Sequence, residues 1–133
     1  MANAAETTKM NAVGWFEIPV KDMQRAMKFY EAVLNIKLER HQMGELDMAW
    51  FPMAHGAAGA AGSLVKHDQW YTPSKDGVLI YFISPSGDLN KDQTQIEKSG
   101  GHVAVPRKSI GEHGFIAVFI DTEGNRVAVH SMK

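Results

Sequence analysis

The first half of the chain combines strand-like and helix-like patterns of apolar positions. Residues 13–20 (VGWFEIPV) alternate and are rich in β-forming side chains, which predicts a strand. Asp22 follows as a candidate N-cap, and apolar residues recur at spacings of three and four over residues 23–34, which predicts an amphipathic helix. Further strands are predicted at residues 36–42, 46–53 and 62–66.

The second half repeats this order after a polar connection at residues 67–77. A strand is predicted at residues 78–84 and a weakly amphipathic helix at residues 88–99, which the following glycine pair ends. Three strands follow, near residues 102–106, 114–120 and 126–130. The turn at residues 122–125 has two residues suited to a positive φ, Gly124 and Asn125, and needs no role beyond the turn. This repeat predicts an α+β fold of two βαβββ modules.

Length and composition favour one domain. A chain of 133 residues with 44% hydrophobic residues can fill a single core. We expect a flexible leader at residues 1–12 and one domain at residues 13–131, with modules at about 13–66 and 78–131. Two such modules leave unpaired sheet edges and an open face, so we also expect a homodimer.

Charge and residue usage exclude several classes of function. The formal net charge is −1 and no long run of Lys or Arg occurs, which argues against a nucleic acid partner. No apolar stretch approaches the ~20 residues that cross a membrane. The chain has no cysteine, which excludes disulfides and thiol nucleophiles. Together with the lack of a signal-peptide pattern, this favours the cytoplasm.

Two stretches carry a family resemblance: FEIPVKDMQRAMKFYEAVLNIKL near the beginning and GEHGFIAVFIDTEGNRVAVHS near the end. They resemble the vicinal oxygen chelate superfamily, which includes glyoxalase I, extradiol dioxygenases and bleomycin-resistance proteins, and most of all its glyoxalase-like bacterial branch. The resemblance covers residues 13–131. It implies that the two modules form a cup-shaped, partly open barrel, and that a small molecule binds inside the cup.

In metal-dependent members of that superfamily, inward-pointing His, Gln or Glu side chains on the first and last strands of each module hold a divalent ion. The resemblance assigns these positions to Trp15, Leu64, Val78 and Ala128. None of these side chains can bind such an ion. We therefore predict no metal cofactor. A divalent metal would require a different strand register, in which Glu17 and His130 are ligands and another histidine completes the set.

Strand alternation predicts a polar layer beside these apolar positions. Because residues two apart on a strand face the same side, Glu17, Lys66 and His130 each share the face of the assigned position two residues before them. A half-buried carboxylate needs a partner, and a Glu–His or Glu–Lys pair would supply one. We predict Glu17 as a general base and His130 as an acid or orienting group. The alternative is a structural role for both residues, at a rim or a sheet edge.

The cup wall is predicted to hold the ligand through mostly apolar side chains. These residues are Trp15, Trp50, Lys66, Val78, Ile80, Phe82, His113 and Ala128. Three functions stay open at this point. The protein is a glyoxalase-like lyase or isomerase of unassigned chemistry that binds a small organic molecule. Alternatively, it is a non-catalytic sequestering protein of bleomycin-resistance type, or a divalent-metal-dependent lyase or dioxygenase.

Overall fold

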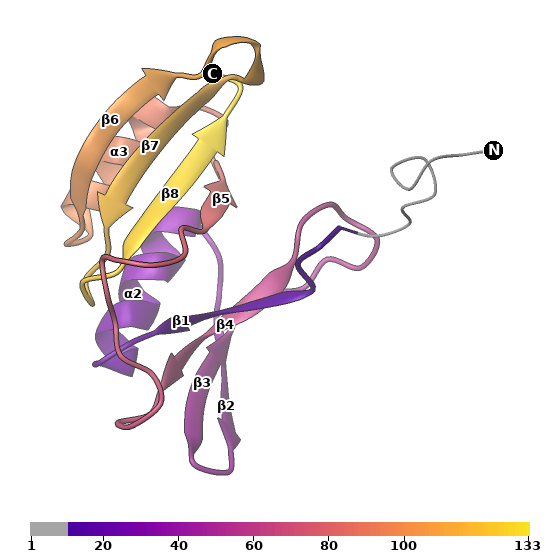
Figure 1. The fold of residues 1–133 in the computed structure, drawn as a ribbon, viewed down its shortest axis with the longest axis vertical. Helices are drawn as coiled ribbons and strands as arrows, with labels where there is room; N and C mark the ends of the chain where they lie inside the picture. The colour runs from indigo at the N-terminus through magenta and orange to yellow at the C-terminus, as the bar shows by residue number, and fades with distance from the viewer. Residues whose placement is uncertain (1–10) are drawn as a thin grey trace.

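A computed structural model describes residues 11–133, which form two four-stranded β-sheets and two α-helices (Figure 1). The elements in chain order are β1 (Trp15–Pro19), α2 (Met23–Leu34), β2 (Glu39–Met43), β3 (Leu46–Trp50), β4 (Ala61–Lys66), β5 (Tyr81–Ile83), α3 (Leu89–Lys98), β6 (His102–Ser109), the short 3-10 helix η1 (Gly111–His113), β7 (Phe115–Ile120) and β8 (Arg126–Ser131). This order confirms the α+β fold of two βαβββ modules. Residues 1–10 of the predicted leader lie outside the described residues.

The two sheets have the same topology. Their strand orders are β1-β4-β3-β2 and β5-β8-β7-β6. In each sheet the first strand of the module runs parallel to the last, and the remaining pairs are antiparallel. Strands β1 and β5 are therefore edge strands, each with one side unpaired within residues 11–133.

Helix α2 begins and ends where the sequence predicts. The Asp22 side chain accepts a hydrogen bond from the Arg25 amide at 3.1 Å, and Asn35 ends the helix with a φ of 54°. The buried residues of α2 are Met23, Ala26, Phe29, Tyr30 and Val33. Within residues 11–133, neither helix is long and apolar enough to cross a membrane.

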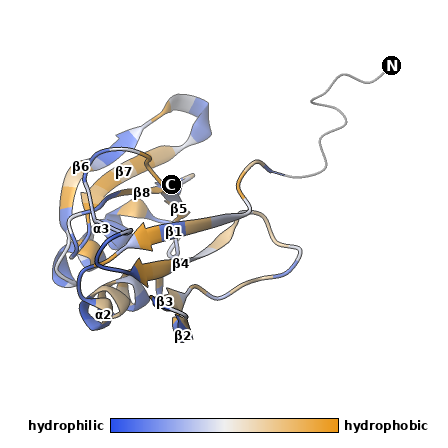
Figure 2. Ribbon diagram, turned by 60° about the horizontal axis from the view of Figure 1, so that its bottom comes forward, coloured by the Kyte–Doolittle hydropathy of each residue, from blue (hydrophilic) through white to orange (hydrophobic). Residues whose placement is uncertain are grey.

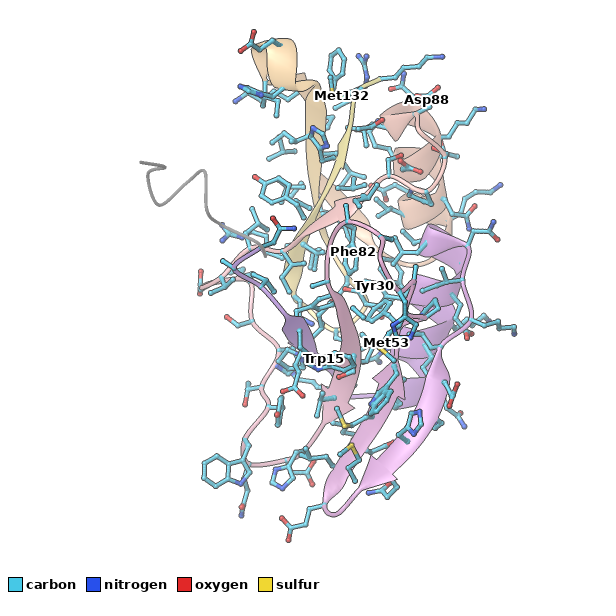
Figure 3. The ribbon with its side chains drawn as sticks, turned by 90° about the vertical axis from the view of Figure 1, so that its right-hand side faces the viewer. Trp15, Tyr30, Met53, Phe82, Asp88 and Met132 are labelled. Atoms are coloured by element: carbon cyan, nitrogen blue, oxygen red, sulfur yellow. The ribbon has the colours of Figure 1, made fainter. Side chains whose placement is uncertain are left out.

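One hydrophobic core joins the two modules. The rings of Tyr30 and Phe82 lie close together where the modules meet (Figure 3), with their centroids 5.9 Å apart. Phe16 and Phe51 complete this aromatic group, at 5.7 Å each from Phe82. Strands β1 and β4 carry the hydrophobic colour in Figure 2, and they supply Ile18 and Leu64 to the core. The core therefore lies between the sheets and the helices of both modules.

Several strand boundaries differ from the sequence prediction. Strand β2 begins at Glu39 because Leu38 packs into the core and its amide binds the Glu31 side chain at 2.9 Å. Strand β6 runs to Ser109, with register shifts along its pairing with β7. Strand β5 is only three residues long. The preceding residues, 78–80, lie in the wall of a cavity instead of a sheet.

The turn at residues 122–125 does more than close a hairpin, which corrects the prediction. Oε1 of Glu123 accepts hydrogen bonds from the amides of Lys21 and Asp22, both at 2.8 Å. Oε2 of Glu123 pairs with Nε of Arg25 at 2.7 Å. The second module therefore binds the start of helix α2 in the first module.

Asn125 strengthens the same connection. Its side-chain amide donates to the Pro19 carbonyl at 2.8 Å, and its side-chain oxygen accepts from the Ser74 amide at 3.0 Å. Gly124 has a φ of 95°, as predicted, whereas Asn125 does not adopt a positive φ. This turn therefore holds the end of β1, the inter-module connection and β8 together.

Candidate functional site

A cavity of about 1040 Å³ lies between strand β1, the loop of small residues at 54–60 that precedes β4, and the segment at residues 78–85. Its wall is mainly apolar and comes from both modules. The polar side chains in the wall include Glu17, Thr72 and Arg126. An apolar cavity with a few polar groups at this size is typical of a site for a small organic molecule.

Strand β1 presents different side chains on its two faces. Phe16 and Ile18 pack into or against the core, whereas Trp15 and Glu17 lie on the opposite face. Because β1 is an edge strand, the cavity reaches side chains of both faces. The alternation in VGWFEIPV therefore places an indole and a carboxylate two residues apart at the cavity.

The carboxylate of Glu17 has a partner that the sequence did not predict. The hydroxyl of Tyr71 donates to Oε1 of Glu17 at 2.6 Å. The hydrogen bond to Glu17 raises the pKa of Tyr71, with smaller contributions from desolvation and from the carboxylate charge. Within residues 11–133, no Lys, Arg or His forms an ion pair with Glu17. The predicted Glu–His or Glu–Lys pair is therefore replaced by a Glu–Tyr pair.

His67 shapes the segment that brings Tyr71 to this place. Its Nδ1 accepts hydrogen bonds from the amides of Gln69 and Trp70, at 3.3 and 3.2 Å. Its Nε2 lies 3.2 Å from a carboxylate oxygen of Glu45, and its carbonyl accepts from the amide of Tyr71. Nδ1 acts as an acceptor, so the ring proton is on Nε2. His67 thus orders the connection between the modules.

Trp50 and Ser63 form a polar pair beside Glu17. The sheet register places Glu17 opposite Ser63, and Ser63 opposite Trp50, across three adjacent strands. Ser63 is fully buried, and among residues 11–133 neither its Oγ nor Nε1 of Trp50 has a hydrogen-bond partner. The ring of Trp15 meets that of Trp50 edge-on, with centroids 5.5 Å apart. Trp15 lines the cavity. Trp50, which was predicted in the cup wall, contacts Trp15 but does not line the cavity itself.

The predicted faces of Leu64 and Lys66 are wrong by one residue. Strand pairing sets Ile18 opposite Leu64, so Leu64 faces the core, and Lys66 shares that face. The Nζ atom of Lys66 pairs with Asp68 at 3.3 Å, away from the cavity. Ser63 holds the position beside Glu17. If the register of β1 and β4 had been known, it would have shown that Ser63 is the neighbour of Glu17.

The residues predicted from the end of the chain do not meet Glu17. His130 donates from Nε2 to the carbonyl oxygen of His113 at 2.6 Å, and neither residue lines the cavity. A carbonyl only accepts, so Nε2 carries the proton. Ala128 is fully buried and lies opposite Tyr81 in the second sheet. The acid role of His130 therefore stays a prediction.

The other predicted wall residues do line the cavity. Val78 is 91% exposed at its mouth, and Ile80 and Phe82 follow along the same segment. Phe82 contributes one side of its ring to the aromatic group in the core and also borders the cavity. The structure thus brings Trp15, Glu17 and this segment together around one space. Their roles in binding stay predictions.

The positions that the resemblance assigns to metal ligands do not suit a metal ion. Trp15 and Val78 are apolar wall residues, and Leu64 and Ala128 are fully buried. Among residues 11–133, no group of three or more His, Asp or Glu side chains is placed to hold an ion. The donor set of one chain therefore does not fit the metal site of the superfamily, and we derive no step through a metal.

Solved structures with this fold have low sequence identity to the chain. A glyoxalase/bleomycin resistance protein from Albidiferax ferrireducens has a TM-score of 0.68 at 16% identity, over 91% of this chain and 98% of its own. TnmS3, an antibiotic binding protein from Streptomyces sp., has a TM-score of 0.62 at 22% identity, over 93% and 98%. Glyoxalase I from Zea mays has a TM-score of 0.65 at 18% identity, and 89% of this chain spans 45% of that chain.

At these identities the structural similarity shows the fold alone, and this chain spans about half the length of the maize enzyme. No curated protein sequence matches the chain. The sequence model of the Glyoxalase/Bleomycin resistance protein/Dioxygenase superfamily, however, matches residues 12–129. The chain therefore belongs to the glyoxalase/bleomycin resistance protein/dioxygenase superfamily.

Proposed function

We propose that this protein binds a small, mainly apolar organic molecule in the cavity between its two modules, without a metal ion. The cavity itself carries the proposal, because about 1040 Å³ of space has aromatic and aliphatic walls that include the carboxylate of Glu17. Apolar walls supply affinity, and the few polar groups fix the orientation of the ligand.

Sequestration is the form of binding that the geometry supports best. The carboxylate of Glu17 accepts a hydrogen bond from Tyr71, and within residues 11–133 of one chain no Lys, Arg or His forms an ion pair with it. The fold itself is compatible with either role, because it occurs in an antibiotic binding protein and in glyoxalase I.

A glyoxalase-like reaction, with Glu17 as base, is the second candidate. The Glu17–Tyr71 hydrogen bond favours it, because it holds the carboxylate in place at the cavity.

Filling the cavity is expected to abolish binding without unfolding the protein. Ala60 lines the cavity, whereas Ala57 lies in the same loop outside the wall. Ala60→Trp should therefore weaken the binding of neutral bicyclic aromatic compounds at least roughly tenfold, because the added ring occupies their space. Ala57→Trp is the matched control. Ligand-observed NMR would measure both, and equal affinities for the two variants would contradict the proposed site.

The fate of the bound molecule separates the two candidates. Mass spectrometry of a ligand after long incubation should recover it unchanged if the protein sequesters it. If product forms and Glu17→Gln stops its formation while binding persists, the glyoxalase-like reaction is correct instead.

We also propose that the protein is a homodimer, formed through the open edges of β1 and β5. Ile83 on β5 is 72% exposed and Val78, just before that strand, 91%. An unpaired edge with exposed apolar side chains favours pairing with a second chain. Light scattering should give roughly twice the 14.7 kDa chain mass.

One charged substitution tests this dimer. Ile83→Lys should shift the protein to a monomer, because it places a charge on the proposed interface. Ile83 also lines the cavity, so the readout is the oligomeric state and not ligand binding. Met43→Lys is the control, since Met43 is also exposed but lies on β2, the opposite edge of its sheet. A monomeric wild-type protein, or a dimer that Ile83→Lys leaves intact, would contradict the proposal.

A further inference from the structure

Three polar groups form a row on the face of the first sheet that is opposite the core. Glu17 on β1, Ser63 on β4 and Trp50 on β3 lie side by side in the strand register. Their chemistry differs along the row. Glu17 presents a hydrogen-bond acceptor, whereas Trp50 presents an N–H donor and Ser63 a hydroxyl.

Two members of this row are buried without a partner. Nε1 of Trp50 and Oγ of Ser63 are the buried side-chain atoms that lack a hydrogen bond within residues 11–133. An unpaired buried donor is unfavourable, and most such groups in folded proteins are paired. Ser63 is the strand neighbour of Glu17, and Trp50 is the neighbour of Ser63 on the other side; of the three, Glu17 lines the apolar cavity. Their lack of partners points to a group that is supplied from outside the chain.

The order of acceptor and donors along the row Glu17, Ser63 and Trp50 defines which polar groups a complementary ligand must carry. The unpaired N–H of Trp50 and hydroxyl of Ser63 can each donate to an acceptor, and the Glu17 carboxylate, which Tyr71 binds through Oε1, has a second oxygen that can accept from a donor. Taking the cavity as the ligand site proposed above, we infer that the row recognises a lactam or carboxamide edge, in which an N–H stands beside a carbonyl. The N–H faces Glu17, the carbonyl oxygen faces Trp50 and Ser63, and the apolar body of the ligand fills the cavity.

A simple cation fits this row less well. An ammonium group would pair with Glu17, but it has no acceptor and would leave Trp50 and Ser63 unpaired. A carboxylate ligand would satisfy the two donors but would face the charge of Glu17. A neutral group with a donor and an acceptor satisfies all three members of the row.

Trp15 lies between Trp50 and the cavity. Its ring borders the cavity, meets the Trp50 ring edge-on and stays 37% exposed. It is the first residue of an edge strand, so its side chain can turn without breaking the sheet. In this binding mode, ligand entry turns Trp15 away from Trp50 and so opens a path from the cavity to the N–H of Trp50.

Three probes test the inference on the wild-type protein. Quinolin-2(1H)-one carries an N–H beside a carbonyl, its N-methyl derivative lacks the donor, and naphthalen-2-ylmethylammonium carries a cation. Ligand-observed NMR gives the dissociation constants. The lactam should bind at least roughly tenfold more tightly than either of the others, because one hydrogen bond to a charged group accounts for such a ratio.

Variants show whether this preference comes from the row. Glu17→Met should weaken the lactam roughly tenfold and leave the N-methyl derivative unchanged, since only the lactam donates to Glu17. Trp50→Phe removes one N–H and should weaken both lactams. Trp70→Phe is the matched control, because Trp70 is 77% exposed and lies outside the row.

Thermal unfolding of the free protein gives an independent readout. Ser63→Ala removes a hydroxyl that has no partner, so the melting temperature should stay within about 2 °C of the wild-type value or rise. A fall of more than about 5 °C would show that the hydroxyl is already paired and would overturn the inference.

The outcomes separate the two proposals. Binding of the probes with no preference for the lactam, or a preference that Glu17→Met leaves intact, overturns the recognition of a lactam edge and leaves the apolar cavity as a binding site. Stronger binding of the ammonium probe also overturns it, in favour of recognition by charge. If none of the three probes binds, the proposed function fails, and the inference fails with it.

Discussion

Replacing Glu123 by glutamine is expected to destabilise the protein by about 3 kcal/mol, because it breaks a buried ion pair and leaves its hydrogen-bond donors with a weaker acceptor. The Glu123 side chain is fully buried, whereas that of Arg25 is 50% exposed. Water can solvate Arg25 after the change, so we expect the lower end of the range for broken buried pairs. Urea unfolding at pH 7 would measure the loss.

The same carboxylate predicts how stability depends on pH. Burial by itself raises the pKa of Glu123, but hydrogen bonds from Arg25 and from the amides of Asp22 and Lys21 outweigh burial and lower that pKa from 4.5 to about 2. A lowered pKa stabilises the folded state above pH 4.5, and this contribution is lost as the pH falls toward 2. At about 1.4 kcal/mol per pKa unit, the loss again amounts to about 3 kcal/mol.

Two comparisons check this prediction. In Glu123→Gln, the free energy of unfolding should fall less steeply between pH 4.5 and pH 2 than in the wild type, because the titrating group is gone. Glu112→Gln is the control, since Glu112 is exposed at the surface. If the two variants unfold at the same urea concentration, Glu123 does not connect the modules as described.

Replacing Gly62 by alanine is expected to disrupt the first sheet and the cavity together. Gly62 lies opposite Phe16 in the β1–β4 register, and the Phe16 ring covers it. A Cβ atom at residue 62 would stand 2.6 Å from two ring atoms of Phe16, and its closest contact would be the Phe16 carbonyl oxygen. Backbone cannot move aside as a flexible side chain can, so we expect a loss of about 3 kcal/mol.

Ligand binding should fall in the same variant. Displacement of β1 moves Trp15 and Glu17, which both line the cavity. Gly14→Ala is the matched control, because an added Cβ at residue 14 meets no atom within 4 Å. Urea unfolding and probe binding would be measured for both variants. A Gly62→Ala protein with wild-type stability would show that β1 and β4 do not approach as closely as described.

Local patterns were enough to predict most of the fold. Helix α2 has the predicted bounds because its apolar spacing and its Asp22 cap are both local signals. The repeat of β-α-β-β-β is likewise visible in the order of the elements. Strand ends were predicted less well, since packing decides them: β5 is short because the residues before it border a cavity.

The candidate site was predicted only in part, because its contacts join distant parts of the chain. The wall residues on β1 follow from strand alternation, whereas Tyr71 is 54 residues away from Glu17. No sequence spacing indicates that a residue of the polar connection returns to β1. The error at Leu64 has a different cause: a shift of one residue in a strand reverses the face of every side chain. Without the register of β4, Ser63 could not be recognised.

The contacts of Glu123 also constrain the order in which the chain can fold. The amide of Asp22 at the start of α2 finds its partner 101 residues later in the chain. While the ribosome is still making the second module, the first module therefore lacks the group that holds its helix to the other sheet. The first module can therefore complete these contacts only after the second module has been made.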